Sequence, residues 1–406
     1  MARDTVIVSA ARTPIGRAPN GAFANTRAED LLVIAIEGAL NRVAGLDRSS
    51  IDDLITGSWM QTHDQGGNLA RRAAVLMGLD SLPGVTVNRA CASSLQAIRM
   101  AHHAIALGEA DTVIASGVEA ISRYDDPRAA GSTPPSDRHP AFAEAGITSR
   151  DAVATNPTWT DPRAVGGLPD IHLAMGHTAE NVARLRGITR EEQDDFALRS
   201  QRLTEEGLAE GFFAREIVPV QVGDRIVDAD ESPRPGTTAQ ALAALRPVFR
   251  ANGTITAGNC CPLNDGAAAV VLMSAQRAAD IGATAMARVV STGVSALSPE
   301  IMGLGPVEAT RRALALAGMS IDDIDMVEMN EAFAAQVLPS CHDLDIDLDR
   351  VNMHGGAIAL GHPFGMGGAR LTTTLLNGMA SRNASTGLVT MCAAGGQGMS
   401  MILERV

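Results

Sequence analysis

Lysine is absent from this chain of 406 residues, so arginine provides every basic side chain other than histidine. Without lysine no Schiff base can form, which excludes pyridoxal-phosphate enzymes and lysine aldolases. A Walker A phosphate-binding loop is excluded as well, because its motif requires a lysine. Tyrosine occurs once, at Tyr124, and a tyrosine–lysine dehydrogenase pair cannot be formed.

Cysteine is scarce, and its spacing does not suit a metal site. The five cysteines form no Cys-x-x-Cys motif, and the nine histidines form no His-Glu-x-x-His motif. We therefore expect neither a disulfide framework nor a zinc site, and no bound metal. The cysteines are Cys91, Cys260, Cys261, Cys341 and Cys392.

Positive charge is in deficit, and long hydrophobic runs are lacking. The formal net charge of −13 disfavours nucleic acids and anionic membranes as general partners. An anionic ligand would have to be bound by local arginines or helix N-termini. The N-terminus carries no basic-then-apolar leader and no run is long enough to span a bilayer, so we expect a cytoplasmic protein without membrane insertion.

Strand-like and helix-like segments alternate at both ends of the chain. The pattern predicts strands at 5–10 and 85–87 and helices at 28–43 and 91–107, and the alternation resumes after residue 287 in a similar order. This favours a layered α/β fold with two similar halves. The region 123–173 is rich in Pro, Asp, Arg and Gly without periodicity and predicts a loop-rich insertion. The predicted division is an N-terminal half at 1–122 completed by 251–276, a loop domain at 123–250, and a C-terminal half at 277–406.

Cys91 lies where a predicted strand turns into a helix. Val85 and Val87 end the strand, and Leu95 and Ile98 follow with helical spacing. The unpaired N–H groups and the dipole of a helix N-terminus favour a thiolate, the nucleophilic form of cysteine. From this segment alone, a nucleophile and a small buried core residue are both open interpretations.

Three further segments in the second half carry reactive side chains or many glycines. They are Asn330-Glu-Ala-Phe333, Gly361-His362-Pro363 and Cys392-Ala-Ala-Gly-Gly-Gln-Gly398. Each adjoins a predicted strand, so all of them can lie at one edge of a sheet, and glycines permit close backbone approach to a ligand. Each of these residues also has an alternative interpretation when it is considered alone. Asn330 can be a turn residue, His362 can cap a turn and Cys392 can be a buried core residue.

Together with Cys91, these segments closely resemble the thiolase family. The family patterns are a nucleophilic cysteine at a strand-to-helix turn, Asn-Glu-Ala-Phe, Gly-His-Pro, and a C-terminal Cys-x-Gly/Ala-Gly-x-Gly. The resemblance extends over nearly the whole chain and implies a thiolase-like fold, in which a loop domain covers the CoA site. Further matching segments are 12–16, 178–181, 190–194, 256–259, 264–268 and 303–306.

The resemblance implies a role for each reactive residue. Cys91, activated by His362, attacks a 3-ketoacyl-CoA and becomes acylated. Cys392 protonates the departing acetyl-CoA carbanion and then deprotonates the incoming CoA thiol. One oxyanion hole consists of His362 and a water held by Asn330. The other consists of the backbone N–H groups of Cys91 and Ala394. CoA is a substrate, and no cofactor is implied.

The resemblance also implies contacts with CoA and the substrate. Arg234 aligns with an arginine that contacts CoA phosphates, with a solvated surface arginine as the alternative. Cys261 replaces a serine that commonly touches the CoA arm, and Gly367 stands where serine is usual. Met175 and Phe333 complete the predicted substrate contacts.

Details near the motifs favour the degradative branch of the family. Short-chain synthetic enzymes often have histidine before the methionine of a Met-Gly motif, whereas Ala174 precedes Met175 here. We expect cleavage of 3-ketoacyl-CoA to acetyl-CoA and a shortened acyl-CoA, as in fatty-acid β-oxidation. The alternatives are an acetyl-CoA acetyltransferase that makes acetoacetyl-CoA by Claisen condensation, and a non-catalytic acyl-CoA or lipid carrier. A homodimer or homotetramer is expected from the family, and a β-oxidation partner subunit stays open.

Overall fold

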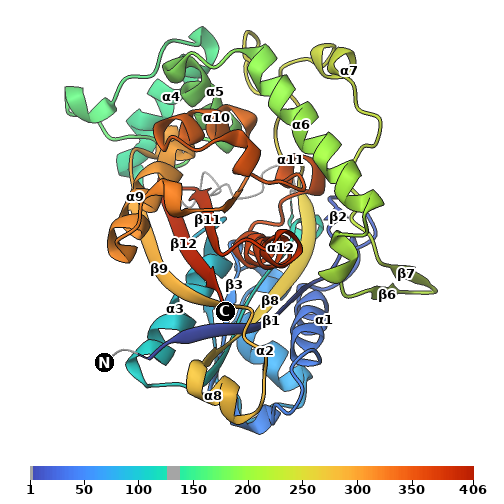
Figure 1. The fold of residues 1–406 in the computed structure, drawn as a ribbon. Coiled ribbons are helices and arrows are strands. Elements are labelled where there is room, and N and C mark those ends of the chain that lie inside the picture. Colours follow the sequence, from blue (N-terminus) through green and yellow to red (C-terminus); the bar gives the residue numbers. More distant parts are fainter. Residues whose placement is uncertain (1–2, 126–137) are drawn as a thin grey trace.

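The computed structural model describes residues 3–125 and 138–406, in which a long twisted sheet is enclosed by helices (Figure 1). Within these residues the sheet contains ten strands in the order β10-β11-β12-β9-β1-β8-β5-β3-β4, with β2 paired to β8. The strands are β1 (Thr5–Arg12), β2 (Gly16–Arg17), β3 (Asp53–Gly57), β4 (Gly84–Val87), β5 (Thr112–Ala120), β8 (Asn264–Ser274), β9 (Ala287–Ala296), β10 (Met326–Met329), β11 (Thr386–Ala393) and β12 (Gln397–Arg405).

The sheet consists of two halves with the same strand arrangement. In the N-terminal half, β3 is parallel to β5, β5 is antiparallel to β8, and β8 is antiparallel to β1. In the C-terminal half, β10, β11, β12 and β9 follow the same directions in the same order. The halves are joined by a short antiparallel pairing of β1 with β9, at Val6 with Arg288 and Ile7 with Ala287. The predicted α/β fold of two similar halves is therefore confirmed.

The described residues form twelve α-helices, some of which cover the sheet while others lie in the inserted region (Figure 1). They are α1 (Ala28–Leu40), α2 (Leu69–Leu76), α3 (Ser93–Leu107), α4 (Ala143–Thr155), α5 (Met175–Arg186), α6 (Arg190–Ala209), α7 (Ala239–Ala243), α8 (Ala275–Asp280), α9 (Gly305–Ala317), α10 (Ala334–Asp343), α11 (Ala357–Leu360) and α12 (Gly367–Arg382).

Helices α3 and α12 form the central layer, because their buried side chains pack against strands of both halves. They approach closely where Gly368 of α12 meets Leu95 of α3, and a methyl group at Gly368 would collide with the Leu95 backbone. Helices α1 and α2 pack on the outer face of the N-terminal half, and α9 and α10 on that of the C-terminal half. The result is an alternation of helix and sheet layers around a central helix pair.

The chain between β5 and β8 is the inserted region, and residues 126–137 of the predicted loop domain lie outside the described residues. It holds α4 to α7 and a short hairpin of β6 (Val220–Val222) and β7 (Arg225–Val227). The region 123–173, predicted to be rich in loops, also contains a helix that was not predicted, α4. Only Ala145 and Ser149 of α4 are buried, so the helix has no apolar stripe that periodicity could reveal. The predicted domain boundaries stay a prediction. No helix in the described part of the chain is long and apolar enough to cross a membrane.

Candidate active site

Cys91 lies in a tight turn between β4 and α3, two residues before the first residue of the helix. Ala90 has a positive φ of 47°. The Ser93 hydroxyl accepts from the Arg89 N–H and donates to the Ala90 carbonyl oxygen, which holds the turn closed. The backbone N–H groups of Ala394 and of Cys91 itself face the buried Cys91 sulfur. These are the two N–H groups that are predicted to form an oxyanion hole.

The surroundings of the Cys91 sulfur favour the protonated thiol. Burial raises its pKa well above the ordinary value, and the nearby groups Cys392 and Glu119 raise it further. The N–H groups of Ala394 and Cys91 oppose this rise, and burial outweighs them. The backbone N–H of Cys91 thus favours the thiolate, as expected from the sequence, but burial has the larger effect on the pKa.

His362 is buried in the connection between α11 and α12, and its imidazole is neutral. Burial, and secondarily the positive charge of Arg370, lower its pKa to about 3. The backbone N–H of His362 donates to Asn264 Oδ1 at 3.0 Å. Gly361 precedes it with a φ of 107°, and a methyl group there would lie 2.5 Å from Asn264 Oδ1. Only glycine therefore fits before this histidine.

Gly367, the first residue of α12, makes room for the imidazole. A methyl group at this position would lie 2.8 Å from Cε1 of His362, 3.2 Å from its Nδ1 and 3.3 Å from the carbonyl oxygen of Cys91. The same glycine thus adjoins both the proposed nucleophile and the proposed base. A serine here, as in the family pattern, would require a different position of the ring.

Asn330 lies directly after β10 and is fully buried. Its Nδ2 lies 3.3 Å from His362 Nε2. Its backbone is held by the Thr390 carbonyl, which accepts from the Asn330 N–H at 3.0 Å, and by the side-chain amide of Gln336, which donates to the Asn330 carbonyl. Among the described residues, Oδ1 has no hydrogen-bond partner. The side chain is therefore fixed beside His362 with one acceptor free for a small polar ligand.

Cys392 lies near the end of β11, and burial raises the pKa of its thiol to about 12. It packs in one cluster with Phe333, and Met175 and Cys261 pack against that cluster. Burial raises the pKa of the Cys261 thiol, and the adjacent thiols, including those of Cys91 and Cys392, raise it further. The structure thus brings together all predicted site residues except Arg234.

Arg234 is exposed on the surface of the inserted region. Its backbone N–H donates to Gln201 Oε1 of α6 at 3.0 Å. Among the described residues no ion pair with Arg234 is present. This position is compatible with either of the two interpretations of the residue.

Sequence reasoning missed Glu119, a fully buried carboxylate on β5. It accepts from the N–H of Gly365 at 2.8 Å, the N–H of Trp59 at 3.0 Å and the hydroxyl of Tyr124 at 2.6 Å. These bonds hold the turn that follows His362. The sequence could have indicated this role only through the presence of one acidic residue in a strand whose other side chains are apolar or small.

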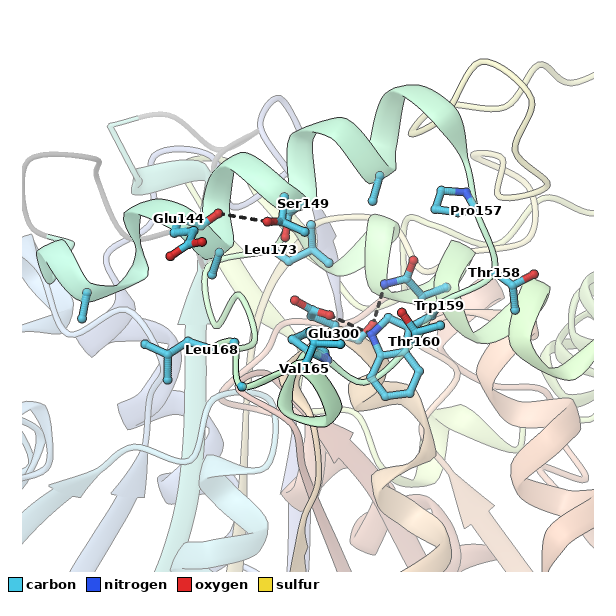
Figure 2. Close-up of a pocket in the computed structure, with 18 of the residues that line it drawn as sticks. Glu144, Ser149, Pro157, Thr158, Trp159, Thr160, Val165, Leu168, Leu173 and Glu300 are labelled. Atoms are coloured by element: carbon cyan, nitrogen blue, oxygen red, sulfur yellow. Dashed lines mark hydrogen bonds between the residues drawn. The ribbon is translucent and has the colours of Figure 1, made fainter.

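A separate cavity of about 440 Å³ lies between α4 and the loop 157–168 (Figure 2). On its floor Trp159 Nε1 donates to Glu300 Oε2 at 2.7 Å, and Asn181 Nδ2 donates to the Glu300 carbonyl at 2.9 Å. None of the reactive residues above lines this cavity.

Comparison with known proteins gives consistent matches along the chain. Residues 5–276 match the model of the thiolase N-terminal domain, and residues 283–405 match that of the thiolase C-terminal domain. A 3-ketoacyl-CoA thiolase of Idiomarina loihiensis is 45% identical over 100% of both chains, and one of Bacillus subtilis is 42% identical over 99% of both.

Two solved structures are similar over the full length. An acetyl-CoA acetyltransferase of Bacillus anthracis has a TM-score of 0.87 at 36% identity, covering 100% of this chain and 99% of that one. A human mitochondrial 3-ketoacyl-CoA thiolase has a TM-score of 0.85 at 35% identity, with the same coverage.

Proposed function

The chain belongs to the thiolase family of acyltransferases, and we propose that it cleaves 3-ketoacyl-CoA with CoA to acetyl-CoA and a shortened acyl-CoA. The observation that carries the proposal is the pair of buried thiols at one site, Cys91 and Cys392, of which Cys392 lies close enough to raise the pKa of Cys91. A neutral imidazole adjoins them, and relatives at 42 to 45% identity are named for this activity.

The first chemical step is acylation of Cys91. The thiol proton passes to His362 while the sulfur attacks the C3 carbonyl carbon of the substrate. The negative charge on the C3 oxygen is stabilised by the N–H groups of Cys91 and Ala394. Because the thiol pKa is raised and the imidazole pKa lowered, the charged pair is unfavourable before substrate binds. Charge separation is therefore coupled to the attack.

The second step breaks the C2–C3 bond. Its electron pair moves onto C2 and the thioester oxygen of the departing acetyl-CoA enolate, while C3 becomes the acyl carbonyl on Cys91. The protonated His362 and a water held by Asn330 stabilise the enolate oxygen. The Cys392 thiol then donates its proton to C2.

The last step releases the shortened product. The Cys392 thiolate takes the proton of an incoming CoA thiol, and the CoA sulfur attacks the acyl group on Cys91. The Cys91 sulfur leaves and regains its proton from His362. Every proton is returned, and the proposed steps require no metal or redox cofactor. We propose that Arg234 contacts the CoA phosphates and Cys261 the CoA arm, and that Met175 and Phe333 contact the substrate.

The cellular setting belongs to the same proposal. We place the enzyme in the cytoplasm, in fatty-acid β-oxidation, as a homodimer or homotetramer. The second candidate function is acetoacetyl-CoA synthesis from two acetyl-CoA, which is favoured by the similarity to an acetyl-CoA acetyltransferase structure. Both reactions use the same residues in opposite directions.

The testing experiment is CoA-dependent cleavage of 3-ketoacyl-CoA substrates by the wild type and Cys91→Ala. We expect cleavage by the wild type and its loss in the variant. A folded wild type that binds CoA and cleaves no substrate would contradict the proposal and favour the carrier. Cleavage of acetoacetyl-CoA alone would favour the synthetic enzyme.

A further inference from the structure

The two backbone N–H groups that face the Cys91 sulfur come from turns in different halves of the molecule. Cys91 itself lies in the turn between β4 and α3, whereas Ala394 lies in the turn between β11 and β12. Donors of this kind stabilise a developing charge best when they are held in place before the reaction. The contacts that hold the two turns together are therefore relevant to catalysis.

Arg89 and Gln397 connect the two turns directly. Arg89 Nη1 donates to Gln397 Oε1 at 2.9 Å, although the two residues are 308 positions apart in the sequence. The other end of the same amide, Gln397 Nε2, donates to the carbonyl oxygen of Ala394 at 3.2 Å. Because a guanidinium only donates and a carbonyl oxygen only accepts, this orientation of the amide is the one that satisfies both contacts.

Arg89 is also fixed on the side of the nucleophile. Its Nε donates to Gln96 Oε1 at 2.9 Å, and its backbone N–H donates to the Ser93 hydroxyl at 2.9 Å. Both partners are among the first four residues of α3, the helix that follows Cys91. A guanidinium presents its donors in a rigid, planar fork, so two side-chain contacts determine its direction. The side chain of Gln397 is thereby tied to the start of α3.

The turn that carries Ala394 contains two consecutive glycines with positive φ angles, 80° at Gly395 and 75° at Gly396. Glycine adopts many backbone conformations, so contacts with neighbouring groups select this one. The Leu297 N–H donates to the Gly396 carbonyl at 2.8 Å. The side chain of Gln397 holds the Ala394 carbonyl at the other end of the turn. This second contact acts on the residue whose N–H faces the sulfur.

We propose that Arg89 and Gln397 are positioning residues for the thiolase reaction, which act by fixing the N–H of Ala394 relative to the N–H of Cys91. This inference rests on the proposed function, in which both N–H groups stabilise the charged C3 oxygen. The two side chains act through the backbone and not by contact with the substrate. A misplacement of about 1 Å in a catalytic arrangement can cost about 10²-fold in rate.

The test compares Gln397→Met, which removes both contacts of the amide, with Gln221→Met. Gln221 is the matched control, because its Nε2 donates to the Gly223 carbonyl at 2.7 Å in the hairpin of β6 and β7. Gln397→Met should fold, since the backbone of residue 397 is paired with Ala393 and Ala296 in the sheet. We expect it to lower kcat for cleavage of 3-ketoacyl-CoA by about tenfold or more and to change KM by less than about threefold. Gln221→Met should change neither constant.

Further variants separate the connection from its two ends. Arg89→Met leaves the amide of Gln397 free to turn away from Ala394, and it also serves if Gln397→Met fails to fold. The loss of kcat in the double variant should be smaller than the product of the two single losses, because both single variants break the same connection. Gln397→Glu keeps an acceptor for Arg89 but has no donor for the Ala394 carbonyl, so it should not restore kcat.

A second measurement does not depend on turnover. The N–H of Ala394 lowers the pKa of Cys91, so its displacement in Gln397→Met should slow alkylation of Cys91 by iodoacetamide at pH 8 by about twofold or more. A turn that has only lost its structure would instead expose the buried thiol and accelerate alkylation. Mass spectrometry of the Cys91 peptide measures the rate in the wild type and in both methionine variants.

The outcomes separate this inference from the proposed function. An unchanged kcat in folded Gln397→Met, a loss confined to KM, or faster alkylation of Cys91 overturns the inference and leaves the thiolase reaction standing. Independent losses in the double variant overturn it as well. A folded wild type that cleaves no 3-ketoacyl-CoA overturns the proposed function, whereas slower alkylation in Gln397→Met would still support the positioning of Ala394.

Discussion

The Nδ2 atom of Asn330 lies 3.3 Å from the Nε2 atom of His362, and both side chains are buried. When Nε2 is unprotonated, it can accept a hydrogen bond from this amide. The low pKa of the imidazole, about 3, keeps it neutral at physiological pH. The pair thus presents a proton acceptor next to a fixed amide oxygen that has no other partner among the described residues.

Asn330→Ala should lower kcat by about 10²- to 10³-fold with a small change in KM, because it removes a group that stabilises charge in the transition state. Steady-state cleavage of a 3-ketoacyl-CoA measures both constants. Thermal unfolding of the variant is the control for folding. A rise in KM without a fall in kcat would instead assign Asn330 to substrate binding.

Gly367→Ala should lower kcat by about tenfold or more, because the added methyl group would lie 2.8 Å from Cε1 of His362 and displace the ring. The matched control is Gly146→Ala on α4, where the nearest atom is the end of the flexible Arg150 side chain at 3.7 Å. Both variants are assayed for cleavage and for thermal unfolding. Equal activity of the two variants would show that the ring has room to move.

Alkylation of Cys91 by iodoacetamide should accelerate about tenfold for each pH unit between pH 7 and pH 10, without a plateau. Burial raises the pKa of this thiol, so the thiolate fraction keeps growing across the whole range. Mass spectrometry of the modified peptide follows the rate, and Cys91→Ala identifies the signal. A plateau below pH 8 would mean that the resting enzyme already carries the thiolate.

Acid should destabilise the protein partly through His354, a buried residue that stacks on Phe212 at 3.6 Å between ring centroids. Burial, followed by the charges of Arg382 and Arg215, lowers its pKa from 6.5 to about 4. The unfolded chain therefore binds this proton below pH 6.5 while the folded chain does not, and the free energy of unfolding falls as the pH drops from 6.5 towards 4. The loss at pH 4 should be about 2 to 3 kcal/mol.

His354→Phe and His354→Asn test this prediction by urea unfolding between pH 7 and pH 4. Both should flatten the pH dependence by the amount assigned to the imidazole. Only the asparagine variant should also lose stability at pH 7, since it cannot stack on Phe212. An unchanged pH slope in both variants would assign the acid sensitivity to other groups.

Motifs in the sequence predicted the layered fold, its two similar halves and the group of residues around Cys91, because strand periodicity and the order of the motifs are local signals. Helix α4 could not be predicted, since it buries too few side chains to show a periodic pattern. The rise in the pKa of Cys91 could not be predicted for a similar reason. It depends on the burial of the sulfur and on the nearby groups Cys392 and Glu119, and the sequence of the turn contains none of that information.

Glu119 shows the same limit. Its role depends on Gly365, Trp59 and Tyr124, which come from three separate parts of the chain. A carboxylate in an apolar strand signals that partners exist, but it does not identify them.

The contact between Gly368 and Leu95 has a consequence for how the chemistry is kept in alignment. In the described residues the pairing of β1 with β9 comprises two residue pairs. The nucleophile Cys91 lies two residues before α3, and the base His362 lies five residues before α12. The distance between the nucleophile and the base is therefore set by the packing of α3 against α12, which are in close contact at Gly368 and Leu95. The contact between Gly368 and Leu95 therefore fixes the position of α12 relative to α3. A side chain larger than hydrogen at residue 368 would push the two helices apart and change the distance between Cys91 and His362.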